Sequence, residues 1–251
     1  MRLEEIGIQL RPRTASEALD LGRVMMHAWY RGATRAWALT YLAFGIPLLL
    51  VLWNHQWIAI ALIWWLKPLC DRALLFAYSR SLFGEGTTLR DVWRALPGLI
   101  RNTALFSALT WRRLSLRRAF LLPVWQLEGQ RGKPARQRCK VLSSRVDNLS
   151  VGLTVFCVNI SFFLGLSLLL LIQLFVPEGQ QGFFRLDDWT NGQVSAATLF
   201  VLNLAYIAGE TIVEPFYVAS GFALYLNRRS ELEGWDIELA FRRMATRKAA
   251  P

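Results

Sequence analysis

Lys67 and Glu214 are ionisable residues inside long apolar stretches, and each directly precedes a proline. Glu210 lies four residues before Glu214, so both carboxylates fall on one face of a helix. A charge within an apolar helix is costly unless it is paired or hydrated. If the two halves of the chain are related by a repeat, Lys67 and Glu214 occupy equivalent positions. This pattern predicts an ion pair between Lys67 and Glu214, with Glu210 one helical turn deeper.

The same residues allow other interpretations. Lys67, Asp71 and Arg72 fit the level of lipid headgroups, where long side chains extend their charge toward water. Proline removes a helix hydrogen bond, so carbonyls freed at two helix breaks, Lys67-Pro68 and Glu214-Pro215, are suited to lining a polar cavity. The candidate intramembrane polar site predicted from the sequence comprises Lys67, Asp71, Glu210 and Glu214.

Motifs for other kinds of chemistry are missing from the sequence. His27 and His55 are isolated, and no HExxH, P-loop, GxGxxG or GxSxG pattern occurs. Cys70, Cys139 and Cys157 form neither a CxxC pair nor a Cys/His metal spacing. We therefore expect no catalytic residue, no cofactor, no metal site and no disulfide framework, and hence no enzyme activity.

Basic residues gather in one part of the chain. The segment from Arg112 to Arg145 holds ten Lys and Arg residues and a single acid, Glu128. Such a run favours contact with anionic lipid headgroups, although it is also typical of a plain topology signal. Nucleic acid is not an expected partner, because no known binding motif accompanies the net charge of +11. The candidate headgroup contacts are Arg112, Arg113, Arg117 and Arg118.

Three long runs of the chain contain no Asp, Glu, Lys or Arg. They are residues 36–66, 148–177 and 189–209. About 20 apolar residues are needed for a helix to cross a ~30 Å hydrocarbon core. The chain is thus predicted to be an all-α polytopic membrane protein with four crossings and interfacial amphipathic helices. The crossings are predicted at 36–53, 57–80, 150–175 and 194–226, with a break at Pro215.

An alternative count is six crossings. It adds a buried pair of helices at 95–111 and 119–127, which the four-crossing interpretation places at the membrane surface. The segment 114–126 is a second predicted surface helix in that interpretation.

The distribution of basic residues predicts the orientation. Six precede the first crossing, 14 lie between 80 and 145, six follow residue 226, and the 177–193 loop has one. The positive-inside rule then places both termini and the large loop in the cytoplasm. The predicted organisation is a single membrane domain, 1–251, divided into 1–35 (cytoplasmic), 36–80 (hairpin), 81–149 (basic region), 150–228 (hairpin) and 229–251 (cytoplasmic tail).

The N-terminal region begins with a helix signal. Thr14 and Glu17 fit a capping box, which predicts a helix through Trp29 with Leu21 and Met25 on one face. This amphipathic helix is interpreted either as an in-plane membrane anchor or as a helix packed on the cytoplasmic end of the protein itself.

Both ends of the chain contain stretches that resemble a known membrane family. The stretches are LRPRTASEALD at 10–20, and Glu214-Pro215-Phe216, ALYLNRR at 223–229 and EGWDIEL at 233–239. They are similar to bacterial membrane domains related to the one attached to glycerophosphoryl diester phosphodiesterases. The resemblance implies a multipass fold in the bacterial inner membrane, often with six crossings. It implies no enzyme activity, because the phosphodiesterase's metal-binding carboxylates cannot be mapped onto this sequence.

Two functions are compatible with these features. The first is a non-catalytic scaffold or accessory subunit that engages anionic lipid, a membrane-protein partner or a second copy through its basic cytoplasmic face. The second is a small transporter or channel with a polar site at the two proline breaks. A lipid-acting enzyme ranks last, because no nucleophile or metal set is recognisable.

Overall fold

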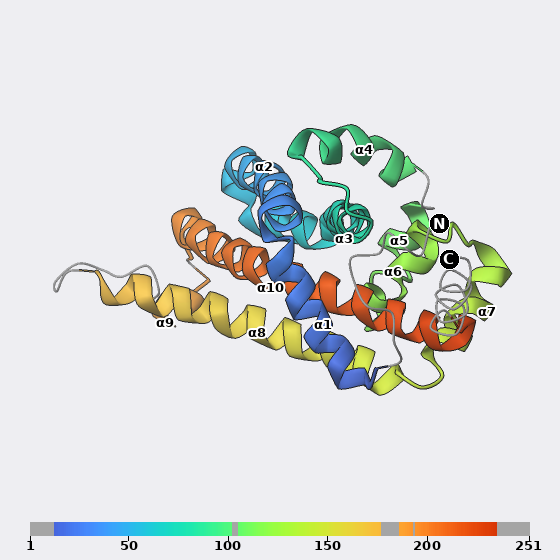
Figure 1. The fold of residues 1–251 in the computed structure, drawn as a ribbon. Helices are drawn as coiled ribbons and strands as arrows, with labels where there is room; N and C mark the ends of the chain where they lie inside the picture. The colour runs from blue at the N-terminus through green and yellow to red at the C-terminus, as the bar shows by residue number, and fades with distance from the viewer. Residues whose placement is uncertain (1–12, 102–104, 177–185, 193, 235–251) are drawn as a thin grey trace, which may run out of the picture.

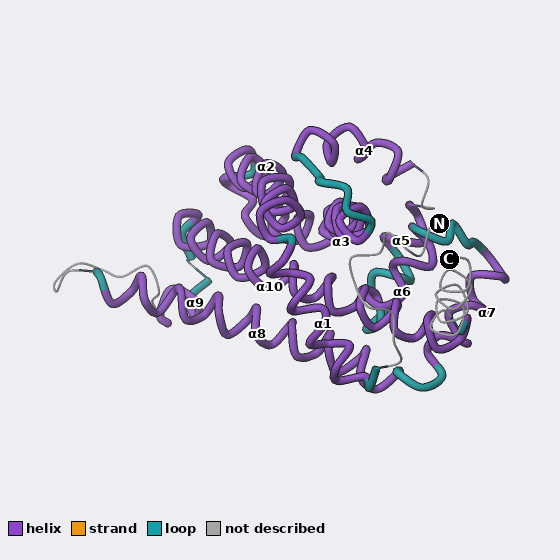
Figure 2. Tube along the Cα trace, in the orientation of Figure 1, coloured by secondary structure: helices purple, strands orange, loops and turns teal. Residues whose placement is uncertain are grey.

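The computed structural model describes residues 13–101, 105–176, 186–192 and 194–234, and every regular element within these ranges is helical (Figures 1 and 2). The predicted all-α class is therefore confirmed. The helices are α1 (Ala15–Ala28), the π-helix η2 (Tyr30–Thr34), α2 (Arg35–Val51), the short 3-10 helix η3 (Trp53–His55), α3 (Gln56–Leu82), α4 (Leu89–Arg101), α5 (Leu105–Leu109), α6 (Arg118–Gln126), α7 (Gly132–Ser143), α8 (Asp147–Leu174), α9 (Leu186–Thr190) and α10 (Ala196–Glu233).

Helix α10 is the centre of the structure and packs against α8, α1, α6 and α3 (Figure 1). It begins where the Ser195 hydroxyl accepts a hydrogen bond from the Thr198 amide, and it ends at Gly234, whose φ of 62° suits a residue without a side chain. Its 38 residues continue through Pro215. Helix α3 likewise continues through Pro68. The predicted breaks at these two prolines are therefore wrong.

Helices α2 and α3 form the predicted hairpin, joined by η3. The buried Gln56 closes the turn, because its amide donates to the Leu49 carbonyl at 2.9 Å. Asn203 of α10 donates in turn to the side-chain oxygen of Gln56 at 3.1 Å. The turn of the first hairpin is thus bonded to α10, which keeps α3 and α10 side by side.

The predicted capping box opens α1. Thr14 and Glu17 exchange hydrogen bonds between side chain and backbone, and the helix runs to Ala28. The face with Ala18 and Met25 is buried against α10, which α1 crosses (Figure 1). This apolar face is used inside the molecule, so the interpretation of α1 as packed on the protein itself holds, and the in-plane anchor does not apply to that face.

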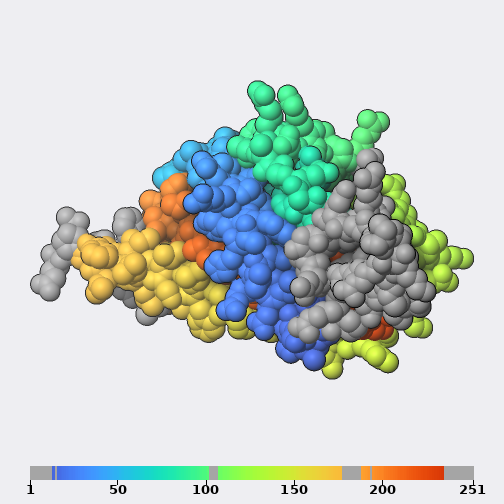
Figure 3. Space-filling view, viewed as in Figure 1, coloured from blue at the N-terminus to red at the C-terminus, as the bar shows by residue number. Residues whose placement is uncertain are grey.

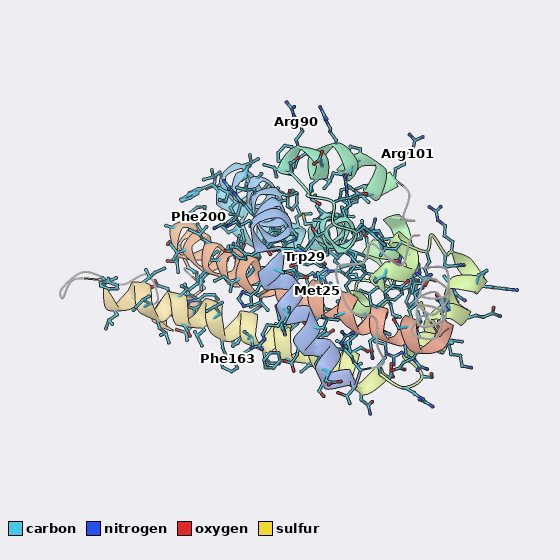
Figure 4. The ribbon with its side chains drawn as sticks, viewed as in Figure 1. Met25, Trp29, Arg90, Arg101, Phe163 and Phe200 are labelled. Atoms are coloured by element: carbon cyan, nitrogen blue, oxygen red, sulfur yellow. The ribbon has the colours of Figure 1, made fainter. Side chains whose placement is uncertain are left out.

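Three helical segments are long and apolar enough to cross a membrane: 30–51, 147–174 and 196–233. Helix α8 is the most exposed of them, and Phe163 projects from its outer side (Figure 4). Helix α3, the predicted second crossing, is not among the three. Its 27 residues include Lys67, Asp71 and Arg72, which interrupt the apolar run.

The basic region consists of short helices. Thr88 and Asp91 exchange side-chain and backbone hydrogen bonds, which explains why α4 begins at Leu89, earlier than predicted. Helix α4 caps the upper side of the molecule over α3 (Figure 3).

The prediction that α6 lies on the surface is wrong, because Phe120 and Val124 are buried and the helix packs against α10. Its nine residues also fall well short of a crossing.

Some predictions fall on segments outside the described residues. These are the start of the family resemblance at 10–12, most of the 177–193 loop, and the end of the chain from 235 to 251.

Candidate functional site

A cluster of four charged side chains lies at the centre of the bundle. We call Lys67, Arg118, Glu210 and Glu214 the ion cluster. The Lys67 ammonium contacts carboxylate oxygens of both Glu210 and Glu214, the latter at 2.6 Å. The side chains of Lys67, Glu210 and Glu214 are 4%, 8% and 3% exposed, respectively. The predicted ion pair between Lys67 and Glu214 is present, and Glu210 joins it.

Arg118 extends the ion cluster to a third helix. It lies on α6, and its guanidinium is 3.9 Å from the second carboxylate oxygen of Glu214. The same guanidinium lies over the ring of Tyr217, 5.3 Å from its centroid. The Tyr217 hydroxyl is 2.9 Å from the hydroxyl of Thr154 on α8. Two formal positive charges thus face two formal negative charges among α3, α6 and α10. The formal charge of the ion cluster is zero.

Asp71 and Arg72 are also inside the protein, so the interpretation in which they extend their charges toward water is wrong. They are 4% and 2% exposed. Arg72 donates to the Leu99 carbonyl in the last turn of α4, at 3.3 Å, and so satisfies a helix-end acceptor. Asp71 and Arg72 line a cavity of about 30 Å³ together with Arg118. This volume accommodates one or two water molecules and no organic solute.

Arg113 binds a backbone carbonyl that Pro68 leaves without its helical hydrogen bond. Proline has no amide hydrogen, so the carbonyl of Trp64, four residues earlier, loses its helical partner. The Arg113 guanidinium donates to that carbonyl at 2.6 Å and stacks over the Trp64 ring, 3.9 Å from its centroid. Arg113 is 4% exposed, and burial lowers its pKa. The carbonyl predicted to line a cavity is therefore capped by a side chain.

The positions of Arg113 and Arg118 correct one prediction. Both were predicted to contact lipid headgroups, but Arg113 caps a buried carbonyl and Arg118 faces Glu214. Basic residues in a long run usually face solvent. Here a freed carbonyl and a buried carboxylate draw two of them inward.

The pairing of Arg113 with Pro68 can be tested by a double-mutant cycle. We expect Arg113→Ala to destabilise the protein by about 1–3 kcal/mol, because the Trp64 carbonyl stays buried without a donor. In a Pro68→Ala background the new amide supplies that donor, so the same substitution should cost less. Thermal unfolding of the four proteins in detergent gives the coupling. Equal costs in both backgrounds would contradict the capping role.

The other two predicted headgroup contacts, Arg112 and Arg117, line an open groove of about 860 Å³. We call it the basic groove. Its walls are the segment after α5, then α6, α7 and the start of α8. Arg117 binds the Asp147 carboxylate through two nitrogens, at 2.5 and 2.6 Å. Arg112 lies over the Trp125 ring, 4.7 Å from its centroid. The residues that line the basic groove include Trp111, Arg112, Arg117, Trp125, Arg131, Arg136, Cys139, Lys140 and Asp147.

Arg131, Arg136 and Lys140 were not singled out from the sequence. The available signal was the spacing of Arg136 and Lys140, four residues apart and so on one face of α7. Helix α7 is fixed to the bundle by Arg138, which binds Glu128 at 3.0 Å and also contacts Glu233. Hydrogen bonds to Glu128 raise the pKa of Arg138.

The thiol of Cys139 in the basic groove should be slow to react. Burial, with help from the negative charge of Glu128, raises the pKa of Cys139 to about 11. Only the thiolate is nucleophilic. We expect its alkylation rate to rise about tenfold per pH unit from pH 7 to pH 9.5, with no plateau near 8.5. Peptide mass spectrometry after timed alkylation measures this, and the denatured protein, which should reach a plateau, is the control.

The described part of the chain thus contains a closed ion cluster and an open basic groove. Within these residues no group of three or more His, Cys, Asp or Glu is placed to hold a metal ion. The arrangement offers electrostatic pairing inside the bundle and anion recognition at its surface. No protein-family model, curated protein or solved structure matches this chain.

Proposed function

We propose that the chain crosses the bacterial inner membrane four times, with both termini and the basic region in the cytoplasm. The three apolar segments account for three crossings. Helix α3 is the fourth in this proposal, because 27 residues span about 40 Å. Its exposed residues include Trp57, Ile58 and Leu62, whereas Lys67 is buried. A helix with apolar residues outside and charges inside suits a lipid environment. A relationship to the phosphodiesterase-associated membrane domains is part of this proposal.

The function we propose is that of a non-catalytic scaffold, whose basic cytoplasmic face engages anionic lipid and a membrane-protein partner. The observation that carries this proposal is the closure of the ion cluster. Lys67 and Arg118 neutralise Glu210 and Glu214 within the packed core, and the adjacent cavity has room only for water. Such a cluster serves to hold α3, α6 and α10 together. The groups offered to other molecules are those of the basic groove.

The test compares what co-purifies with tagged protein from native membranes in mild detergent. We expect a stoichiometric protein partner that is retained by Glu210→Gln and lost when Arg131, Arg136 and Lys140 are all replaced by Gln. The matched control replaces Arg90, Arg94 and Arg101 on α4, which removes the same charge from another surface.

The contrary outcome is equally defined. If proteoliposomes show a solute or ion flux that Glu210→Gln abolishes without lowering the folded yield, the protein is a transporter and the scaffold proposal fails.

A further inference from the structure

The lining of the basic groove is strongly cationic. Among the described residues that line it are Arg112, Arg117, Arg131, Arg136 and Lys140, against one carboxylate, Asp147. That carboxylate is engaged by Arg117. The other cationic side chains come from three different segments, the region after α5, the start of α7 and its outer face, which converge on one hollow. Convergent cations in a concave site recognise an anion, and phosphate is the group that arginine binds with the best geometry.

One edge of the basic groove is apolar and exposed. Trp111 lines the groove and is 83% exposed, and Leu114 in the same loop is 69% exposed. Exposed Trp and Leu are unfavourable in water, yet Trp is typical of the interface between headgroups and hydrocarbon. The groove thus combines cationic side chains with an exposed Trp, and the loop that carries this Trp adds an exposed Leu.

The position of the basic groove relates it to the bilayer. Asp147 lies in the groove and is also the first residue of α8, a helix long and apolar enough to cross a membrane. Nine residues further along α8, Phe156 is 57% exposed. The hollow therefore lies at the end of an apolar helix face, at the depth where headgroups are found when α8 spans the bilayer.

From this geometry we infer that the basic groove binds the headgroup of an anionic phospholipid. The phosphate contacts Arg131, Arg136 and Lys140, and the acyl chains leave the groove past Trp111 and Leu114 toward the exposed face of α8. A volume of about 860 Å³ is within the range of small-molecule sites and accommodates a headgroup. This inference rests on the proposed cytoplasmic orientation of the basic region and names the lipid class that its groove selects.

The experiment uses the full-length protein, delipidated in detergent and titrated with phosphatidylglycerol or phosphatidylcholine under native mass spectrometry. We expect one phosphatidylglycerol to bind with clear preference over phosphatidylcholine. Replacing Arg131, Arg136 and Lys140 by Gln should weaken that binding on the order of a hundredfold. The control triple variant of Arg90, Arg94 and Arg101 should bind as the wild type does. Arg90 and Arg101 are exposed and point away from the molecule on α4 (Figure 4).

A second arm distinguishes a lipid from a soluble phosphate. We expect Trp111→Ser with Leu114→Ser to weaken phosphatidylglycerol binding at least tenfold, while glycerol 3-phosphate competes only weakly in the wild type. If glycerol 3-phosphate displaces the lipid fully and the two apolar substitutions have no effect, the groove is a site for soluble phosphate and the inference is overturned. If both triple variants lose phosphatidylglycerol binding equally, the binding is general charge attraction and the inference of a site in the basic groove is overturned.

These outcomes are separable from the fate of the scaffold proposal. If the protein binds phosphatidylglycerol selectively and no protein partner co-purifies, the lipid inference is supported and the proposed protein partner is rejected. If a protein partner co-purifies but the protein shows no preference for phosphatidylglycerol, the scaffold proposal is supported and the lipid inference is overturned.

Discussion

Replacing Lys67 with Met is expected to destabilise the protein by about 3–5 kcal/mol, because it leaves Glu210 and Glu214 buried without their shared cation. The formal charge of the ion cluster then falls from zero to minus one. In detergent, the midpoint of thermal unfolding should fall on the order of 10 °C. The yield of membrane-inserted protein should fall as well.

A second substitution separates charge imbalance from lost packing. In the double variant Lys67→Met with Glu210→Gln, the formal charge returns to zero and Glu214 keeps Arg118 at 3.9 Å. We expect this variant to regain most of the lost stability. If it is no more stable than Lys67→Met alone, the ion cluster is not held together by charge balance.

The second large effect is expected at Gly221. A methyl group added there would lie 2.6 Å from the Ala119 backbone of α6, closer than real Cβ contacts allow. Because the obstacle is backbone, α6 must move away from α10, and Arg118 moves with it. We expect Gly221→Ala to cost about the 1–3 kcal/mol typical of overpacking, measured by thermal unfolding in detergent.

A matched glycine provides the control. Gly152 is an exposed glycine in α8, and a Cβ there would meet nothing within 4 Å. We expect Gly152→Ala to be neutral or to stabilise α8 by up to about 1 kcal/mol. A similar loss of stability at both positions would mean that the effect at Gly221 comes from replacing a flexible glycine in a helix and not from close packing against α6.

The sequence predicted those features that depend on local pattern or on charge alone. The capping box at Thr14 follows from four adjacent residues, and the hairpin of α2 and α3 follows from two apolar runs around a polar turn. The pairing of Lys67 with Glu214 was predictable, because two opposite charges in apolar helices have few other partners.

Features that depend on distant neighbours were not predictable in this way. From their immediate neighbours alone, Pro68 and Pro215 predict helix breaks, but both helices continue through them in the packed bundle. At Pro68, Arg113 from a distant segment donates a hydrogen bond to the Trp64 carbonyl. Helix α6 follows directly on a basic segment, Arg112 to Arg118, which favours a position at the membrane surface. It is buried because Gly221, about 100 residues later in the sequence, gives it a place on α10.

The 143 residues that separate Lys67 from Glu210 have a consequence for synthesis in the membrane. At about 5–20 residues per second, a ribosome needs roughly 7–30 s to reach Glu210 after Lys67 has been made. In the proposed topology α3 must enter the bilayer within that interval, before either glutamate exists. Asp71 lies four residues from Lys67 on the same helix and is made at once. It is the counter-ion available during that wait, which gives a biosynthetic reason for a carboxylate outside the final ion cluster.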